Sequence, residues 1–152
     1  VTLLTVAGMQ SGVLPKPETV PQKRERMQVA AVVAHDFTFT DRADGALVVG
    51  DPATGGTAMV LEPGSNSGFI RGVMRGLMRE RMLHQVPRTA PVTVTQWANG
   101  ALTLEDKSTG RIIELGSFGQ TNRAAFAQLL VPYAGAAAAK PQVAATEARR
   151  PA

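Results

Sequence analysis

Three arginines spaced four residues apart are the most distinctive candidates for binding chemistry in this sequence. The stretch RGVMRGLMRERM places Arg71, Arg75 and Arg79 on one stripe of a helix, because residues four apart share a helical face. Arginine presents a planar fork of donors that fits carboxylates and phosphates. Two interpretations follow: a ridge that binds a partner's carboxylate, a lipid phosphate or nucleic acid, and a solvated helix face without a partner.

Two further stripes accompany the arginines on the same predicted helix. Gly72 and Gly76 lie one turn apart, and so do Met74, Met78 and Met82. Small residues one turn apart allow another backbone to approach closely. In the alternative interpretation, the glycines and the apolar residues pack on a sheet of the same domain.

The remaining titratable and nucleophilic residues show no catalytic or metal-binding pattern. His35 and His84 lack metal-site spacing. Either could be a single axial ligand of a pigment or haem, but a partly buried structural histidine is the simpler interpretation. Ser65 and Ser67 lie outside any G-x-S-x-G motif, and PGSNSG lacks the lysine of a phosphate-binding loop. The acidic candidates, all at strand ends or turns, are Asp41, Asp44, Asp51, Glu105 and Asp106. We therefore expect no enzymatic activity, no metal and no cofactor.

The elements that must position these residues occur twice. Residues 37–55 read FTFTDRADGALVVGDPATG, and residues 92–110 read VTVTQWANGALTLEDKSTG. At an offset of 55, nine of the nineteen positions are identical. A duplicated unit constrains the architecture before any local assignment, so the shared Asp, Asn, Thr and Gly are interpreted mainly as turn residues that are used twice.

Each copy is predicted to contain three strands followed by a helix. Asp-Gly and Asn-Gly between alternating apolar runs indicate tight hairpins. The predicted strands are 35–40, 46–49, 57–61, 92–97, 101–104 and 111–115, and the predicted helices are 69–83 and 121–131. Two glycines would permit the first helix to be a strand instead, but its period of four favours a helix. Ser67 or Asn66 would cap the first helix, and Thr121 the second.

These elements predict an α+β domain of two tandem βββα repeats with pseudo-two-fold symmetry. A three-stranded unit with one apolar face needs another layer to cover it. The six antiparallel strands would therefore join in a sheet, a sandwich or an open barrel covered by the helices. Trp97 precedes a hairpin turn, where it would serve as a core or edge anchor or as a contact residue.

Composition places few limits on function. The chain has 152 residues, 44% of them hydrophobic, which suffices for one domain with a core. Its net charge of +4 and its pI of about 10.1 favour acidic partners or an anionic membrane surface. The absence of cysteine excludes disulfides, thiolate nucleophiles and cysteine-based zinc sites.

The chain divides into five segments. Residues 1–14 are mostly apolar but shorter than the roughly 20 residues that cross a bilayer. We predict that they are the end of an N-terminal membrane anchor, the alternative being a short buried strand or helix. Residues 15–34 form a proline-containing linker. The repeats occupy 35–85 and 86–133, and the Ala/Pro-rich tail at 134–152 is predicted to be disordered or to lie along a partner.

Several strings match a known family. The specific ones are GFIRGVMRGLMRER at 68–81 and FGQTNRAAFA at 118–127, with weaker support from FTDRADGALVV at 39–49, LEPG at 61–64 and LTLEDKSTG at 102–110. Over 37–130 the sequence resembles the photosynthetic complex assembly proteins of the PuhC type from purple phototrophic bacteria. The resemblance implies one N-terminal membrane span, a soluble periplasmic domain, and a non-enzymatic role in building the core complex of reaction centre and light-harvesting 1 ring.

The leading functional hypothesis is therefore a membrane-tethered assembly factor or accessory subunit of this core complex, acting by protein–protein contacts. It would reside in the bacterial inner (intracytoplasmic) membrane, with its domain in the periplasm and reaction-centre and light-harvesting 1 subunits as partners. The candidate contact residues are Arg71, Arg75, Arg79, Arg81, Phe69 and Trp97. The alternative is a basic nucleic-acid-binding module that uses the ridge Arg71/Arg75/Arg79. It is disfavoured because the interleaved aromatics of a single-strand reader are missing.

Overall fold

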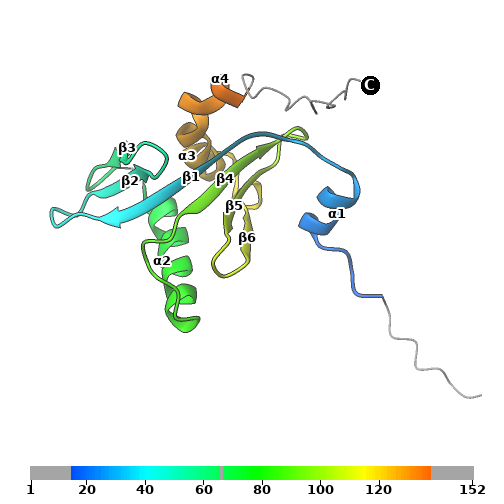
Figure 1. Cartoon of the computed structure of the whole chain (residues 1–152), viewed down its shortest axis with the longest axis horizontal. Helices are drawn as coiled ribbons and strands as arrows, with labels where there is room; N and C mark the ends of the chain where they lie inside the picture. Colours follow the sequence, from blue (N-terminus) through cyan, green and yellow to red (C-terminus); the bar gives the residue numbers. More distant parts are fainter. Residues whose placement is uncertain (1–14, 66, 138–152) are drawn as a thin grey trace, which may run out of the picture.

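The chain folds as an α+β domain around one open antiparallel sheet (Figure 1). The computed structural model describes residues 15–65 and 67–137. The strands are β1 (Ala31–Asp41), β2 (Leu47–Asp51), β3 (Gly56–Leu61), β4 (Val92–Trp97), β5 (Leu102–Asp106) and β6 (Arg111–Glu114). The helices are α1 (Val20–Arg26), α2 (Gly68–Leu83), α3 (Gln120–Leu130) and α4 (Ala134–Ala137), with 3-10 turns η1 (Leu115–Phe118) and η2 (Val131–Tyr133). The predicted α+β class and antiparallel sheet are confirmed.

The first strands of the two sequence copies pair with each other in the middle of the sheet. The strand order is β3-β2-β1-β4-β5-β6, so β3 and β6 are the edges. Phe37 lies opposite Val92, and these are the first residues of the two similar strings. The hairpins also correspond at the offset of 55: Thr38 faces Gly50 as Thr93 faces Glu105. The two halves therefore contribute three strands each to one sheet, with their first hairpins in corresponding registers. The outer pairs differ, because a bulge between Val49 and Gly50 shifts the register of β2 and β3, whereas β5 and β6 pair without one.

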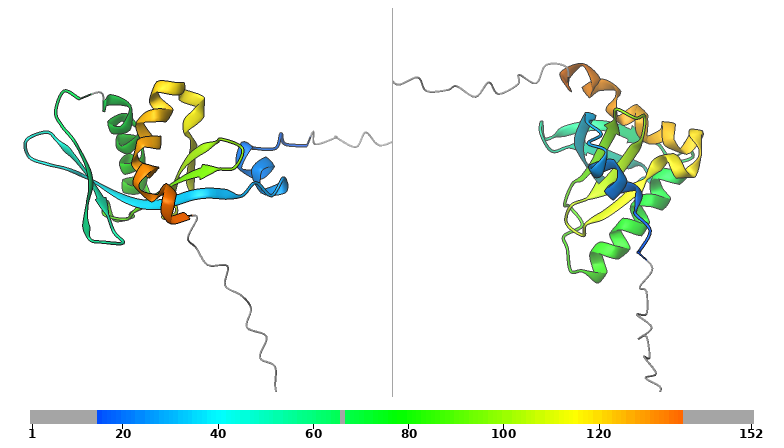
Figure 2. Two further views of the ribbon diagram at one scale, coloured as in Figure 1. Left: turned by 90° about the horizontal axis from the view of Figure 1, so that it is seen from above. Right: turned by 90° about the vertical axis from the view of Figure 1, so that its right-hand side faces the viewer.

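The core lies between one face of this sheet and the two long helices. Both α2 and α3 lie on the same side of the strands (Figure 2). The core is built from strand residues such as Phe37 and Leu104 and from helix residues such as Leu77 and Phe126. All four are at most 1% exposed. Burial of this shared apolar face, which neither half could cover with its strands alone, holds the two halves together.

The predicted helices are confirmed, but their predicted caps are not. Ser67 precedes α2, yet its side chain makes no capping hydrogen bond and instead accepts one from the Arg71 Nε at 3.1 Å. Thr121 is wrong as a cap, because α3 begins one residue earlier and Gly119 precedes it with a φ of 90°. Asn66 lies outside the described residues.

The segment predicted as an extended linker contains a helix. Thr19 and Gln22 form a reciprocal capping box at the start of α1. Pro21 lies in the first turn, where no backbone N–H is required. The linker prediction treated proline as a helix breaker and missed this tolerated position. The segment also ends differently, since β1 begins at Ala31.

One arginine of α1 fixes the helix against the second half of the domain. Arg24 is 6% exposed and donates to both carboxylate oxygens of Glu114 at 2.6 Å. Its guanidinium also lies 4.7 Å from the ring centroid of Trp97. The Trp97 indole N–H in turn donates to the Thr103 hydroxyl at 2.9 Å. Trp97 is thus half-buried in a structural cluster, which fits its interpretation as an anchor, and its role as a contact residue stays a prediction.

Two predictions concern the ends of the chain. The anchor at 1–14 lies outside the described residues, and so does the tail from residue 138 onward. Residues Ala134–Ala137, where the predicted tail begins, form α4. Within the described ranges, no helix combines the length and the apolar character needed to cross a bilayer.

Candidate docking groove

The first arginine of the predicted ridge binds its own domain. The Arg71 Nη2 donates to the backbone carbonyls of Gly45, at 2.8 Å, and Leu61, at 3.2 Å. Its Nη1 lies 3.8 Å from the carboxylate of Asp41. Arg71 therefore ties α2 to the first hairpin turn, and most of its donors are occupied.

An arginine of the second half makes the corresponding contact. The Arg123 Nη2 on α3 donates to the carbonyl of Gly100 at 2.7 Å. Gly45 and Gly100 are equivalent turn residues, with φ of 88° and 83°, a conformation that favours glycine. In both halves, an arginine one turn into the helix therefore holds the carbonyl of the hairpin glycine.

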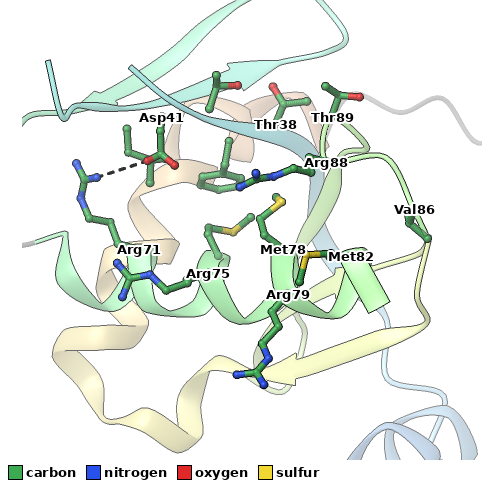
Figure 3. A pocket seen from close by; sticks show the side chains of 14 residues that line it. Thr38, Asp41, Arg71, Arg75, Met78, Arg79, Met82, Val86, Arg88 and Thr89 are labelled. Atoms are coloured by element: carbon green, nitrogen blue, oxygen red, sulfur yellow. Dashed lines mark ion pairs between the residues drawn. The ribbon is translucent and has the colours of Figure 1, made fainter. Parts of the chain in front are cut away.

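The other two ridge arginines are exposed and unengaged. Arg75 and Arg79 both lie on the solvent side of α2, and Figure 3 shows Arg79 directed away from β1. Neither guanidinium makes an ion pair or a hydrogen bond with any residue that the structure describes. A partner could therefore reach both groups without disrupting the fold.

Arg81 is wrong as a partner-binding residue. It is 0% exposed, and its Nε donates to the Asp106 carboxylate at 2.6 Å. Its remaining donors reach the backbone carbonyls of Arg88, Ala90 and Pro91, at 2.6 to 3.2 Å. Arg81 falls on the buried side of α2, so it fastens the end of this helix to the second half of the sheet.

A groove runs between α2, β1 and the segment that follows α2 (Figure 3). Its volume is about 980 Å³. The methionine stripe lines it: Met74 is buried, Met78 is half-buried, and Met82 is 69% exposed. Figure 3 shows Met78 and Met82 directed toward β1. The groove thus has an apolar, flexible lining.

The rim of the groove is cationic. Arg71, Arg75, Arg79 and Arg88 line it, against the single carboxylate of Asp41 among its described lining residues. Arg71 is engaged by backbone carbonyls, but the side chains of Arg75, Arg79 and Arg88 have no anionic partner in the described part of the chain. The groove therefore carries uncompensated positive charge beside methionine.

The glycine stripe does not pack against the sheet. Gly72 and Gly76 are exposed, and a Cβ atom placed on either would meet no described atom within 4 Å apart from its chain neighbours and the nearby backbone of α2. The interpretation that these glycines pack on the sheet of the same domain is therefore wrong. They leave the outer side of α2 bare, next to Arg75 and Arg79.

The aromatic candidate on α2 faces away from the groove. Phe69 is half-buried, with its ring centroid 5.2 Å from that of Phe118 and 5.7 Å from that of Phe126. Phe118 is the more exposed ring, at 49%. Sequence reasoning missed Phe118, although it lies in the specific string FGQTNRAAFA. Phe69 and Phe118 therefore belong to the contact between α2 and η1.

A second polar cluster joins η2, which follows α3, to the sheet. The His35 Nε2 lies 2.9 Å from the Asp51 Oδ1, and the Tyr133 hydroxyl donates to the Asp51 Oδ2 at 2.9 Å. The His35 and Tyr133 rings stack with centroids 3.7 Å apart. The hydrogen bond from His35, followed by those from Tyr133 and the Ala53 amide, lowers the pKa of Asp51 from 3.8 to about 2. His35 is half-buried, as predicted, whereas His84 is exposed.

The corresponding aspartate of the second half is held by Arg81. Burial of the Asp106 carboxylate opposes its ionisation, but the donors of Arg81 and Ser108 outweigh this and lower its pKa. Asp51 and Asp106 correspond at an offset of 55, and Arg81 and Tyr133 at the helix offset of 52. Each helix end is therefore bound by the aspartate of the opposite half. Among residues 15–65 and 67–137, no three acidic or histidine side chains are grouped so as to hold a metal.

Comparison with known protein families gives one match, and it covers most of the chain. Residues 32–136 match the family described as Photosynthetic complex reorganisation protein PuhC. Neither the curated proteins nor the solved structures gave a match. The family implies a role in photosynthetic complex assembly, with protein partners in that complex. The chain belongs to the PuhC family of photosynthetic complex reorganisation proteins.

Proposed function

We propose that this protein is a membrane-tethered assembly factor or accessory subunit of the core complex of reaction centre and light-harvesting 1. It would act by protein–protein contacts and catalyse no reaction. The family match over residues 32–136 is the observation that carries the proposal. The groove beside α2 supports it, because a cationic rim next to exposed methionine suits a protein partner.

The two buried polar clusters have structural explanations. Asp106 binds Arg81 at the end of α2, and Asp51 binds His35 and Tyr133. Each cluster joins segments that are distant in sequence, which is sufficient reason for the polar groups to be buried. This interpretation supports a scaffold that presents a surface to other proteins.

The proposed location is the inner membrane, with the folded domain in the periplasm. The resemblance of the sequence and the apolar residues 1–14 support this placement. Protease treatment of spheroplasts tests it: added protease should degrade the domain without lysis of the cells. Protection until lysis would contradict the periplasmic placement.

Affinity purification tests the partners. The tagged chain would be isolated from photosynthetic membranes in mild detergent, with an untagged strain as control, and co-eluting chains identified by mass spectrometry. We expect reaction-centre and light-harvesting 1 subunits to be enriched over the control. A tagged chain that elutes without them would contradict the proposal.

We also propose that the two halves arose from one duplicated βββα unit with pseudo-two-fold symmetry. The support is the matched register of the first hairpin in each half, the equivalent arginines Arg71 and Arg123, and the reciprocal contacts of Asp51 and Asp106. An experimental structure tests it by superposition of residues 37–61 on 92–115. Failure of the two segments to superpose would contradict the duplication.

A further inference from the structure

The exposed side of α2 presents chemistry that repeats at every helical turn. Arg75 and Arg79 form one row, and Met78 and Met82 form a second row beside it. Because the glycine stripe at Gly72 and Gly76 is bare, a partner backbone can lie close to the helix. The helix has 16 residues, which makes this face about 24 Å long.

The methionine row favours a protein segment as the occupant. Methionine is unbranched and polarizable, so it adapts to apolar side chains of different shapes. Met82 is 69% exposed and Met78 half-buried, and covering them would remove apolar surface from water. The groove volume of about 980 Å³ provides room for several side chains.

The arginine row specifies the charge of the occupant. Arg75 and Arg79 are one turn apart, which places their Cβ atoms about 6 Å from each other. Two carboxylates at the same spacing on a partner could each form a bidentate pair with one guanidinium. A phospholipid such as phosphatidylglycerol carries one phosphate at a fixed distance from its chains, whereas a peptide can repeat acidic and apolar side chains at the spacing of both rows.

Resting on the proposed function, and deepening it, we propose that the outer side of α2 and its groove bind an acidic amphipathic segment of a partner protein. Carboxylates of this segment pair with Arg75 and Arg79, and its apolar side chains cover Met78 and Met82. The bare glycines at positions 72 and 76 permit its close approach.

Methionine methyl NMR tests this binding with the full chain. The probe is a synthetic helical peptide of 16 residues, the length of α2, with rows of Glu and Leu at four-residue spacing. We expect it to shift the methyl signals of Met78 and Met82, while Met27, which directly follows α1 and is 58% exposed, stays unchanged. Comparable peptides with Lys for Glu, or Ser for Leu, should shift neither signal.

Two matched pairs of variants assign the contacts. Arg75→Glu/Arg79→Glu and the control Lys23→Glu/Lys107→Glu change the net charge equally, from +4 to 0. The first should weaken binding at least about tenfold and the control should not. Met82→Ser should weaken it about fivefold, whereas Val131→Ser in η2, away from α2 and with a similar exposure of 70%, should not.

Several results would overturn the proposal. One is equal binding of the acidic peptide to the Arg75→Glu/Arg79→Glu variant and to its charge-matched control. Another is a Lys peptide that shifts the methyl signals of Met78 and Met82 as much as the acidic peptide does. A third is that only phosphatidylglycerol vesicles or a single-stranded oligonucleotide shift these signals. The last two probes test a lipid surface and a nucleic acid as occupants. Thermal unfolding of every variant checks that the fold is retained.

Co-purification separates this inference from the proposed function. If the wild-type chain recovers core-complex subunits and Arg75→Glu/Arg79→Glu recovers them equally well, the groove inference is wrong and the assembly function stands. If the wild-type chain recovers none, the proposed function fails, whatever the peptide does in solution.

Discussion

Each of the two long helices carries an arginine at the equivalent position, one turn from its start, and this arginine makes the same contact in both halves of the fold. Arg71 on α2 and Arg123 on α3 correspond at an offset of 52. Each donates to the carbonyl of the hairpin glycine in its own half, Gly45 or Gly100, at 2.8 and 2.7 Å. A contact made twice in corresponding places indicates a requirement of the fold.

The next two arginines occur only on α2. At the offset of 52, Arg75 corresponds to Ala127 and Arg79 to Val131. The second half therefore folds with neither arginine, and neither guanidinium has a partner in the described part of the first half. The difference separates one arginine that builds the fold from two that are available for a partner.

The two equivalent aspartates, Asp51 and Asp106, show a different kind of contrast. Both positions are conserved between the halves, but different side chains donate hydrogen bonds to them. Asp106 binds the buried guanidinium of Arg81, and Asp51 binds His35 and Tyr133. Each closes a contact between one half and the helix end of the other. The position of this contact is therefore common to both halves, whereas the side chain that binds the aspartate differs between them.

Among the variants that test this comparison, removal of the Asp106 carboxylate should lower the free energy of unfolding the most. Asp106→Ala leaves the fully buried Arg81 without its carboxylate, and loss of one partner of a buried ion pair costs about 3–5 kcal/mol. Urea unfolding measures the loss. Glu105→Ala on the same strand is the control, with an expected change within about 0.5 kcal/mol. Equal losses in the two variants would show that the tie does not hold the halves together.

Removal of the two shared arginines should have an intermediate effect. Arg71→Ala should lower the free energy of unfolding by about 1.5–3 kcal/mol, because hydrogen bonds from a charged donor to two carbonyls are lost. Arg123→Ala should cost about 1 kcal/mol, since Arg123 makes one such bond. Arg75→Ala is the matched control and should change stability little. A loss for Arg75→Ala as large as that for Arg71→Ala would break the comparison.

The hydrogen bonds that Asp51 accepts should make a smaller contribution to stability, and this contribution should depend on pH. Its folded-state pKa of about 2 lies below the usual 3.8 because of the hydrogen bond from His35. Its contribution to stability is therefore fully present above pH 3.8 and is lost as the pH falls through about 2. Urea midpoints of the wild type and of Asp51→Asn should differ at neutral pH and converge toward pH 2. A constant difference would exclude ionised Asp51 as the cause, and Glu25→Gln, at an exposed carboxylate, provides the control.

Local patterns predicted most of the fold. The Asp-Gly and Asn-Gly turns indicated the hairpins at Gly45 and Gly100, and the four-residue period indicated α2. The helix α1 was missed because proline is a breaker within a helix but not in its first turn. Local signals of this kind predict where helices, strands and turns occur, but they do not predict which of these elements contact one another.

The candidate site was only partly predictable, for the same reason. The sequence places Arg75 and Arg79 on one face, but Arg81 lies on the buried side of the same helix and binds Asp106, 25 residues later. Similarly, no local pattern pairs His35 with Tyr133. Such partners are determined by how the two halves pack against each other, and the local spacing of residues in the sequence does not predict this packing.

The most direct test of the account transplants the second half's residues into α2. Arg75→Ala/Arg79→Val should change the free energy of unfolding by less than about 0.5 kcal/mol, because both side chains are exposed and the corresponding residues of the second half are Ala127 in α3 and Val131 at the start of η2. Purified from photosynthetic membranes, this variant should lose most of the core-complex subunits that the wild type retains. Undiminished recovery of those subunits by a folded variant would contradict the claim that these arginines serve a partner and not the fold.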